Sequence, residues 1–331
     1  MKKLLLFTLT LFVLQLNAQP LFYEPFSYTP SNVNGLFVQS SAQWKNANTG
    51  DSIYVVSNSL SYPGLAASQG AKIAFDGAGV DNYRIYTPQL SGEIYTSCIF
   101  NVPSFGGLNT TGSYFLTITE ANSTSAFGAC VWLKRSATAG KFNIGISNRS
   151  NSAVSFLPND LDTLTSYFIV FSYEIIAGAA NDVSSIWLNT AQFGGTEPLA
   201  SATAVGGTDF SAAGAGRLML RQASATLTPF VQIDEIRVGT TWNDVTPCAS
   251  PTTYYQDLDG DSYGNPNVTV QACMPMPGLV LNNQDCNDNN AAINPNTVWY
   301  ADADGDGFGN ITVRSEEHTS ELQSRVDISY A

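Results

Sequence analysis

Histidine is almost absent from this sequence. The 331 residues include one histidine, His318, and it lies in a carboxy-terminal stretch that we set aside below. The rest of the chain has no imidazole for general acid–base catalysis or for metal ligation. Ser/His/Asp and Cys/His sets are therefore excluded, and no glycine-rich phosphate loop is present.

Basic residues are also scarce. The chain has 14 lysine and arginine residues against 27 aspartate and glutamate residues, a formal net charge of −13. An acidic surface argues against nucleic acid and anionic membranes as partners, and it is compatible with bound cations. The acidic residues are clustered in one segment: residues 248–313 hold eight aspartates and no lysine, arginine or glutamate.

Long apolar runs are missing from all but the amino terminus, so no transmembrane segment is expected. Residues 1–18 combine two lysines, a short apolar run and a small-residue exit, MKKLLLFTLTLFVLQLNA. The apolar run is too short to span a bilayer comfortably, which disfavours the alternative of a retained membrane anchor. The pattern predicts a secretory signal peptide and an extracellular or outer cell-surface location, where disulfides persist.

The carboxy-terminal stretch 314–331 has no strand or turn pattern in its sequence, and it begins where the second copy of a repeated motif is interrupted. Its first eleven residues, RSEEHTSELQS at Arg314–Ser324, resemble the translated read-through of a sequencing-library adapter. The alternative is a solvated helical tail. We interpret 314–331 as an artefactual tail and exclude it, with its histidine, from fold and function.

No segment has a sustained apolar period of 3.6 residues, which disfavours a helical protein. Between residues 20 and 247, short runs instead alternate apolar with polar residues, and clusters of Gly, Asn, Ser and Thr separate them. This spacing predicts an all-β sandwich or jelly roll over 20–247. We expect its core to include Ile73, Phe75, Phe115, Ile118, Trp132, Ile169, Phe171, Trp187 and Ile236.

Three stretches of this domain carry a resemblance. FYEPFSY near its start, YFLTITEA in its middle and VQIDEIRVGTTWNDVTP at its end resemble the laminin-G-like, concanavalin-A-like jelly rolls of secreted bacterial surface proteins. The resemblance implies two packed antiparallel sheets and ligand binding at a sheet face or loop rim. It does not by itself imply catalysis.

Residues 248–313 contain an internal repeat with a step of 45 residues, since QDLDGDSYGN at 256–265 returns as ADADGDGFGN at 301–310. Alternate carboxylates on a turning loop can converge on one hard cation, as in the first half of an EF-hand loop. Ser262 and Val268 replace that motif's glycine and glutamate, so residues across the repeat must complete the cage. The predicted ligands are Asp257, Asp259, Asp261, the carbonyl of Tyr263, Asp285 and Asp288, and in the second copy Asp302, Asp304, Asp306 and Phe308.

The ligand chemistry favours Ca²⁺. Without histidine, oxygen ligands dominate, and these suit calcium better than zinc or copper. The motifs DLDGDSYGN and DCND, with Cys273 and Pro277-Gly278, resemble thrombospondin type-3 calcium repeats and the MopE-like metal-binding motif of bacterial surface proteins. One MopE-like precedent implies copper, for which Met274 and Met276 would supply thioethers. The remaining alternative is a solvated acidic turn without metal.

Five cysteines are present. Cys273 and Cys286 flank residues 274–285 inside the repeat, and we predict a disulfide between them that stabilises a segment with little core. Cys98 and Cys130 lie in separate strand runs and either form a bridge or are buried thiols. Cys248 is left without a predicted partner, which truncation of the chain would explain.

These features predict a secreted or surface-displayed, non-enzymatic binding or adhesion protein, with glycans or other extracellular surface ligands as partners. Concanavalin-A-like glycosidases carry paired carboxylates on one strand as Glu-x-Asp-x-x-Glu, and this run is absent. Asp234 and Glu235 are adjacent, so they would point to opposite faces of a strand. Two alternatives remain: a glycan-active, glycoside hydrolase-like enzyme or its accessory region, and a structural spacer without a ligand.

The second repeat is expected to continue beyond this sequence. Its match to the first copy ends at 311–313, where the adapter-like stretch begins. Adding 45 to the positions of Cys273 and Cys286 places the missing cysteines near positions 318 and 331. Long sequencing reads across the locus are expected to show a continued repeat; an uninterrupted reading frame that encodes RSEEHTSELQS would refute the truncation.

Overall fold

The computed structural model describes residues 20–273, 275, 277–301, 314–315 and 323–324. The predicted signal peptide and most of the predicted artefactual tail lie outside these residues. The chain forms two compact units. The first unit holds residues up to Tyr62, Ser68–Asn189 and Leu199–Val245, and the second holds Pro63–Ala67, Thr190–Pro198 and the residues from Thr246 onward. Two loops inside the 20–247 range therefore belong to the second unit.

Strands make up nearly all of the regular structure. The two helices among the described residues have four residues each, and no helix in this part of the chain is long and apolar enough to cross a membrane. The elements, in chain order, are β1 (Phe22–Glu24), α1 (Leu36–Gln39), β2 (Trp44–Asn46), β3 (Tyr54–Val56), β4 (Lys72–Phe75), β5 (Asn82–Gln89), β6 (Gly92–Ser104), β7 (Ser113–Glu120), β8 (Phe127–Arg135), β9 (Lys141–Arg149), β10 (Ser155–Phe156), β11 (Leu161–Asp162), β12 (Tyr167–Ile175), β13 (Val183–Leu188), β14 (Ala202–Val205), β15 (Ala215–Leu220), β16 (Phe230–Gly239), α2 (Trp242–Val245), β17 (Thr252–Gln256), β18 (Thr269–Ala272), β19 (Leu279–Val280), β20 (Trp299–Ala301), β21 (Arg314–Ser315) and β22 (Gln323–Ser324).

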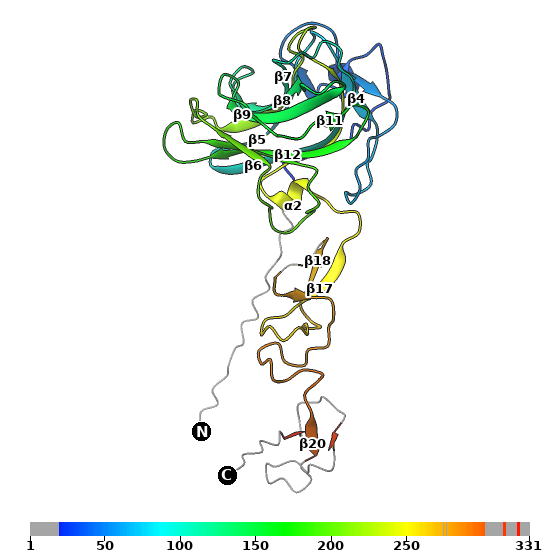
Figure 1. Ribbon diagram of the computed structural model, residues 1–331, viewed down its shortest axis with the longest axis vertical. Helices are drawn as coiled ribbons and strands as arrows, with labels where there is room; N and C mark the ends of the chain where they lie inside the picture. The colour runs from blue at the N-terminus through cyan, green and yellow to red at the C-terminus, as the bar shows by residue number, and fades with distance from the viewer. Residues whose placement is uncertain (1–19, 274, 276, 302–313, 316–322, 325–331) are drawn as a thin grey trace, which may run out of the picture. The chain divides into compact units, whose positions relative to one another are not determined.

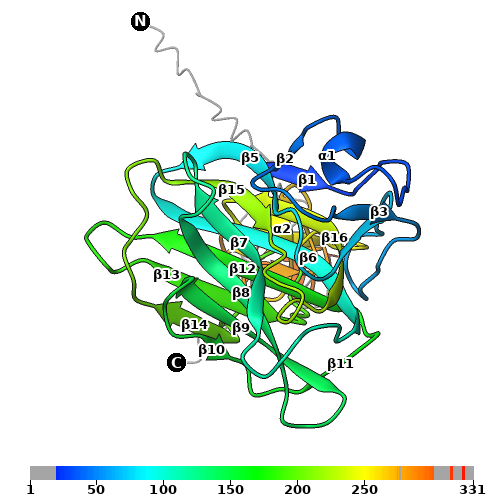
Figure 2. The ribbon, with the colours of Figure 1, turned by 90° about the horizontal axis from the view of Figure 1, so that it is seen from above.

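The first unit is a sandwich of two antiparallel sheets (Figure 1). Sheet A has the strand order β14-β13-β12-β6-β16-β4-β3, and β1 pairs with β16. Sheet B has the order β10-β9-β8-β7-β15-β5-β2, and β11 pairs with β9. Figure 2 shows β7, β8 and β9 side by side in sheet B. Neighbours that are distant in sequence, such as β6 and β16, require crossovers between the sheets, and the predicted all-β jelly roll is confirmed.

The core of the first unit lies between the two sheets, because alternate residues of each strand point inward. Fully buried rings from both sheets meet there, as where Phe100 of β6 lies 5.7 Å from Phe115 of β7 between ring centroids. Seven of the nine predicted core residues belong to this core: Ile73, Phe75, Phe115, Ile118, Ile169, Phe171 and Ile236.

The two predicted core tryptophans lie on the outer faces of the sheets instead. Trp187 of β13 is 2% exposed because Trp242 of α2 covers it, with ring centroids 5.2 Å apart. Trp132 of β8 is half-buried on the outer face of sheet B. Trp187 is buried, as predicted, but neither tryptophan belongs to the cluster between the sheets, because hydrophobicity alone does not show which face of a strand a ring occupies.

The second unit is built around a small antiparallel sheet. β17 pairs with β18 in the register Thr252↔Ala272, and it pairs with β19 on its other side. The acidic loop 257–268 therefore connects two neighbouring strands. A separate three-stranded sheet joins β20 to β21 and β22.

Candidate functional site

The acidic loop that follows β17 is held by its first carboxylate. Asp257 Oδ1 accepts hydrogen bonds from the backbone N–H groups of Gly260 (2.8 Å) and Asp261 (3.1 Å), and Asp257 Oδ2 accepts one from Ser262 (3.1 Å). An aspartate that bonds backbone N–H groups ahead of it closes a local turn. The alternation of aspartate with glycine and serine thus becomes a tight loop.

Two groups of carboxylates converge at this loop. Ligand oxygens of Asp257, Asp259 and Asp288 lie within 4.8 Å of one another, and so do those of Asp259, Asp261 and Asp285. Asp285 and Asp288 are 5% and 6% exposed. The structure thus brings together all five aspartates that the sequence assigned to the first copy.

Three oxygens in the second group are buried and have no hydrogen-bond partner: Oδ2 of Asp259, of Asp261 and of Asp285. In each residue the other oxygen accepts a backbone N–H, as Asp285 Oδ1 does from Asn287 at 2.7 Å and Asp261 Oδ1 does from Tyr263 at 2.9 Å. Each carboxylate therefore uses one oxygen to hold the loop and leaves the other unpaired in a shared space. Buried, unpaired carboxylate oxygens are costly unless a cation compensates them.

The electrostatics of the carboxylate cluster also favour a bound cation. Burial raises the pKa of the Asp285 carboxyl, and the neighbouring Asp261, Asp259 and Asp288 raise it further. A bound divalent cation would be the largest local charge and would reverse this effect.

The segment that carries Asp285 and Asp288 is bonded directly to the loop. The Leu258 N–H donates to Asp288 Oδ1 at 2.6 Å, and the Asp285 N–H donates to the Gly264 carbonyl at 3.1 Å. A Cβ on Gly264 would lie 2.7 Å from the Asn282 carbonyl oxygen, so a larger residue would separate the two segments. The glycine of the DSYGN motif thus permits this close approach.

Backbone strain is present in the loop at the position where an EF-hand has glycine. Ser262 has φ +75°, in the left-handed region that side chains other than glycine's rarely adopt. This conformation costs an L-residue about 1 kcal/mol. The equivalent position of the second copy, 45 residues later, is Gly307.

The remaining predicted ligands have other placements. The hydroxyl of Tyr263 accepts a hydrogen bond from Asn296 Nδ2 at 2.6 Å, and its carbonyl as a ligand stays a prediction. The other residues named for the metal lie outside the described residues: Asp302, Asp304, Asp306, Phe308, Met274 and Met276.

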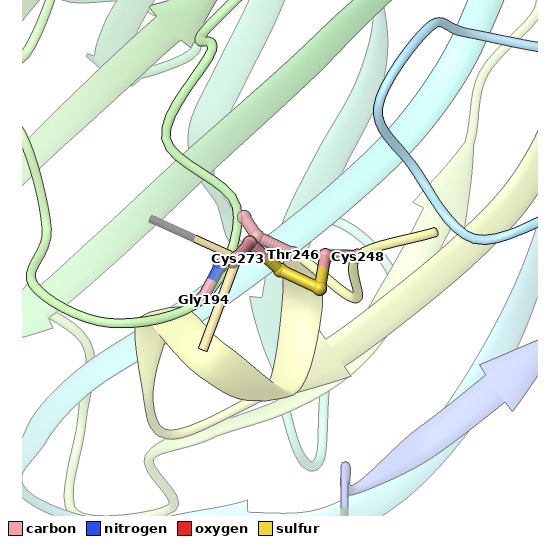
Figure 3. The surroundings of a disulfide bond; sticks show 4 residues. All are labelled: Gly194, Thr246, Cys248 and Cys273. Carbon is pink, nitrogen blue, oxygen red and sulfur yellow. Dashed lines mark hydrogen bonds between the residues drawn. A yellow bond between two sulfur atoms is a disulfide. The ribbon is translucent and has the colours of Figure 1, made fainter. Parts of the chain in front are cut away.

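The predicted Cys273–Cys286 disulfide is wrong, because Cys273 is bonded to Cys248, with 5.9 Å between their Cα atoms (Figure 3). The register of β17 and β18 brings together the residues that precede one strand and follow the other. Nearby, the Gly194 N–H donates to Thr246 Oγ1 at 2.9 Å. Cys286 is an exposed free thiol, since both of its aspartate neighbours in the DCND motif turn toward the acidic loop. The pairing could have been found from the hairpin, whose open end the two cysteines flank.

Cys98 and Cys130, whose pairing the sequence left open, are both free and buried. They belong to different sheets. Burial raises the pKa of the Cys130 thiol to about 11, so it is neutral at physiological pH.

Asp234 and Glu235 have a structural role, because both hold the loop between β3 and β4 through hydrogen bonds. The register of β16 against β6 shifts between Asp234 and Arg237, and Glu235 has φ +54°, which marks a β-bulge. The bulge interrupts the expected alternation, so both carboxylates reach the same loop. Asp234 Oδ2 accepts the Leu60 N–H and Glu235 Oε1 accepts the Gln69 N–H, each at 2.7 Å. Burial raises the pKa of Asp234 to about 8, but both residues are at most 1% exposed, out of reach of a substrate.

The outer face of sheet B carries an aromatic cluster that the sequence analysis missed. The Tyr114 ring lies 5.3 Å from Trp132 and 5.5 Å from Phe127 between centroids, and Trp132 Nε1 donates to Ser147 Oγ at 2.8 Å. On the same strand as Tyr114, the side chain of Thr117 is fully buried and donates to the Gly128 carbonyl at 2.8 Å. Outward positions on a solvated sheet face are usually polar. The aromatic residues at such positions in YFLTITEA and GACVWLKR were therefore the signal in the sequence that could have revealed the cluster.

No family model matches the chain, and no curated protein matches it. Solved structures with a similar fold do. An endo-β-1,4-glucuronan lyase from the fungus Trichoderma reesei is 12% identical, and the match covers 70% of this chain and 100% of the lyase, with a TM-score of 0.42. A GH43 glycoside hydrolase whose active site was engineered to display both endo-xylanase and exo-arabinofuranosidase activity is 10% identical. The match covers 65% of this chain and 41% of that chain, with a TM-score of 0.40.

A third similar structure is the carbohydrate recognition domain of Emp46p in its metal-free form. It is 12% identical, and the match covers 68% of this chain and 99% of that domain, with a TM-score of 0.34. At these identities the likeness is one of fold.

The prediction of a non-enzymatic binding or adhesion protein is corrected by these comparisons. The solved structures with a similar fold include a lyase and a glycoside hydrolase, which goes against that prediction; at these identities the likeness shows the fold and assigns no activity to this chain. The sequence disfavours an enzyme only because one strand motif, Glu-x-Asp-x-x-Glu, and histidine are missing, and a glycan-active enzyme was kept as an alternative. Neither absence is a ground for excluding catalysis on a fold that also carries such enzymes.

The disulfide assignment predicts how each cysteine affects the β17–β18 hairpin. C248S or C273S is expected to destabilise the hairpin by about 3 kcal/mol, because the bridge closes a loop across a separation of 25 residues. Hydrogen exchange of the amides in β17 and β18 should then be roughly 100-fold faster. C286S is the matched control and should leave exchange unchanged. Equal acceleration in C286S, or a Cys273–Cys286 peptide in a non-reducing digest, would contradict the pairing.

Proposed function

We propose that residues 257–288 form a Ca²⁺ site in an exported protein. The observation that carries the proposal is the set of three buried, unpaired carboxylate oxygens on Asp259, Asp261 and Asp285, whose ligand atoms lie within 4.8 Å of one another. Hard oxygen ligands from several carboxylates suit Ca²⁺, which takes six to eight oxygens at about 2.3–2.6 Å. The resemblance to thrombospondin type-3 and MopE-like repeats and the predicted signal peptide agree with this proposal.

Ca²⁺ binding at this site would supply stability that the second unit lacks, because it has little apolar core. Between Cys248 and the end of β20, the described residues with buried apolar side chains are few, and Tyr254 is one of them. A ligand that binds only the folded loop stabilises it by mass action. Extracellular calcium modules work at dissociation constants of about 10⁻⁴–10⁻³ M, which fits a cage with a strained serine.

Calorimetric titration of the full chain with Ca²⁺ tests the site. D285N is expected to weaken binding by at least about tenfold, because it removes one charge and one of the unpaired oxygens. D160N, which changes an exposed aspartate of the first unit, should bind as the wild type does. S262G should tighten binding roughly two- to fivefold, because glycine adopts the left-handed conformation without strain. Absence of heat, together with a melting curve that chelator does not shift, would overturn the proposal.

We also propose that the jelly roll is the glycan-active part of the chain and that its ligand lies on the outer face of sheet B. The aromatic cluster supports this, since Trp132 and Phe127 present half-buried rings at outward positions. Sugar rings have flat apolar faces that stack on such rings. Tyr114, beside them, stays protonated at neutral pH, because burial raises its pKa to about 12, so its hydroxyl remains a hydrogen-bond donor.

A panel of soluble polysaccharides tests the second proposal. Retention of the full chain in affinity gels and the release of new chain ends would be measured together. W132A is expected to weaken retention by at least about tenfold, because it removes the largest ring system of the aromatic cluster. F37A removes a partly exposed ring of α1 that is not part of the aromatic cluster, and this variant should retain binding. Neither retention nor product with any member of the panel would refute the proposal.

A further inference from the structure

Charge is distributed unequally between the two sheets of the first unit. The strands of sheet B carry seven basic and two acidic residues, a net charge of +5. The strands of sheet A carry five acidic and two basic residues, a net charge of −3. A positive sheet within a chain of net charge −13 requires a local explanation.

Three cations of sheet B stand at outward positions and are stacked on aromatic rings. Arg221, the residue after β15, lies 4.3 Å from the ring centroid of Tyr114. Arg217 of β15 lies 4.8 Å from that of Tyr83, and Lys134 of β8 lies 4.1 Å from that of Phe156. Stacking on a ring fixes a guanidinium in place while leaving its edge free for an anion.

None of these three cations is neutralised by a carboxylate. The ion pairs in the described part of the chain are Arg84–Glu24, Lys141–Asp162 and Arg237–Glu235. Moreover, Nε of Arg217 and Nε of Arg221 are buried and have no hydrogen-bond partner. A buried guanidinium nitrogen without a partner is costly, as the unpaired carboxylate oxygens of the acidic loop are.

Two carboxylates of this region are already used elsewhere. Asp81, whose pKa is raised by burial and lowered in part by the charge of Arg221, accepts the Gln222 backbone N–H at 2.7 Å. Glu120, at the end of β7, accepts the Ser211 backbone N–H at 2.7 Å. The face therefore combines free cations with aromatic rings and lacks a protein anion to pair with them.

We propose that the outer face of sheet B binds an acidic polysaccharide, a proposal that rests on the glycan function argued above and specifies its substrate class. Sugar rings stack on Trp132 and its neighbours, and the anionic groups of the polymer, carboxylates or sulfate esters, bond to Arg217 and Arg221. Guanidinium groups bind both kinds of oxyanion through paired N–H donors. Because the protein as a whole repels polyanions, only this face attracts them, which confines the polymer to the aromatic platform.

The experiment uses matched pairs of polymers in affinity gels with the full chain and Ca²⁺. Dextran sulfate is compared with dextran, and carboxymethyl-cellulose with hydroxyethyl-cellulose, so that sulfate and carboxylate are tested separately. The chain is expected to bind at least one acidic polymer about tenfold or more tightly than its neutral counterpart. Binding should weaken by about tenfold between 50 and 300 mM salt.

Variants locate the binding surface. R217Q/R221Q should lose the preference for the acidic polymer, and R217K/R221K should keep part of it, since lysine retains charge but not paired donors. R135Q is the matched control, because Arg135 is also stacked on a ring, that of Phe105, but lies at a strand end and outside the aromatic cluster. Replacing Ca²⁺ in the gel by a chelator should leave the preference intact, and this result would exclude bridging through Ca²⁺.

The outcomes separate this inference from the function on which it rests. Equal binding of neutral and acidic polymers would overturn the inference and leave the glycan function standing. Absence of binding to every polymer would overturn both. Acidic binding that survives in R217Q/R221Q would place the site elsewhere, and equally tight binding of poly(dT) would show a general polyanion surface; either result overturns the inference. Melting curves of each variant show whether a loss of binding reflects unfolding.

Discussion

Burial of apolar side chains between two sheets is the constraint on which the first unit depends. Because side chains alternate along a strand, filling one face of a sheet determines which residues stand on the other. The outer face of sheet A is covered in part by α2, where Trp242 packs on Trp187. The outer face of sheet B carries rings and cations instead, and the proposed ligand face rests on this difference.

The second unit has no comparable core and is held by other means. A disulfide joins the open end of its hairpin, and aspartate side chains bond the backbone N–H groups of the acidic loop. These bonds place like charges close together, which opposes folding unless a cation is present. The two units are thus stabilised against unfolding in different ways. The first removes apolar surface from water, and the second depends on a disulfide and on hydrogen bonds and charge balance within its acidic loop.

Much of the fold could be predicted from alternation, and the five aspartates that meet at the first loop could be predicted from spacing. What could not be predicted depends on local geometry. A bulge at Glu235 turns two adjacent carboxylates toward one loop, and bulges leave no fixed trace in the sequence. The partner of Cys273 depends on a hairpin register, since a disulfide follows Cα distance and not nearness in sequence. Trp132 was misplaced because hydrophobicity does not distinguish a core ring from a surface ring.

Net charge has different consequences at different scales. Summed over the chain, a charge of −13 argues against polyanionic partners. Summed over sheet B, the sign reverses, and screening limits the reach of the remaining acid to about 8 Å at physiological salt. Arg217 and Arg221 therefore respond to what lies on their own face, not to the chain's total. Asp259, Asp261 and Asp285 likewise each have one buried, unpaired carboxylate oxygen that a local counter-ion would compensate. The same physical condition, buried polar atoms without partners, supports the proposed cation site in one unit and the proposed anion site in the other.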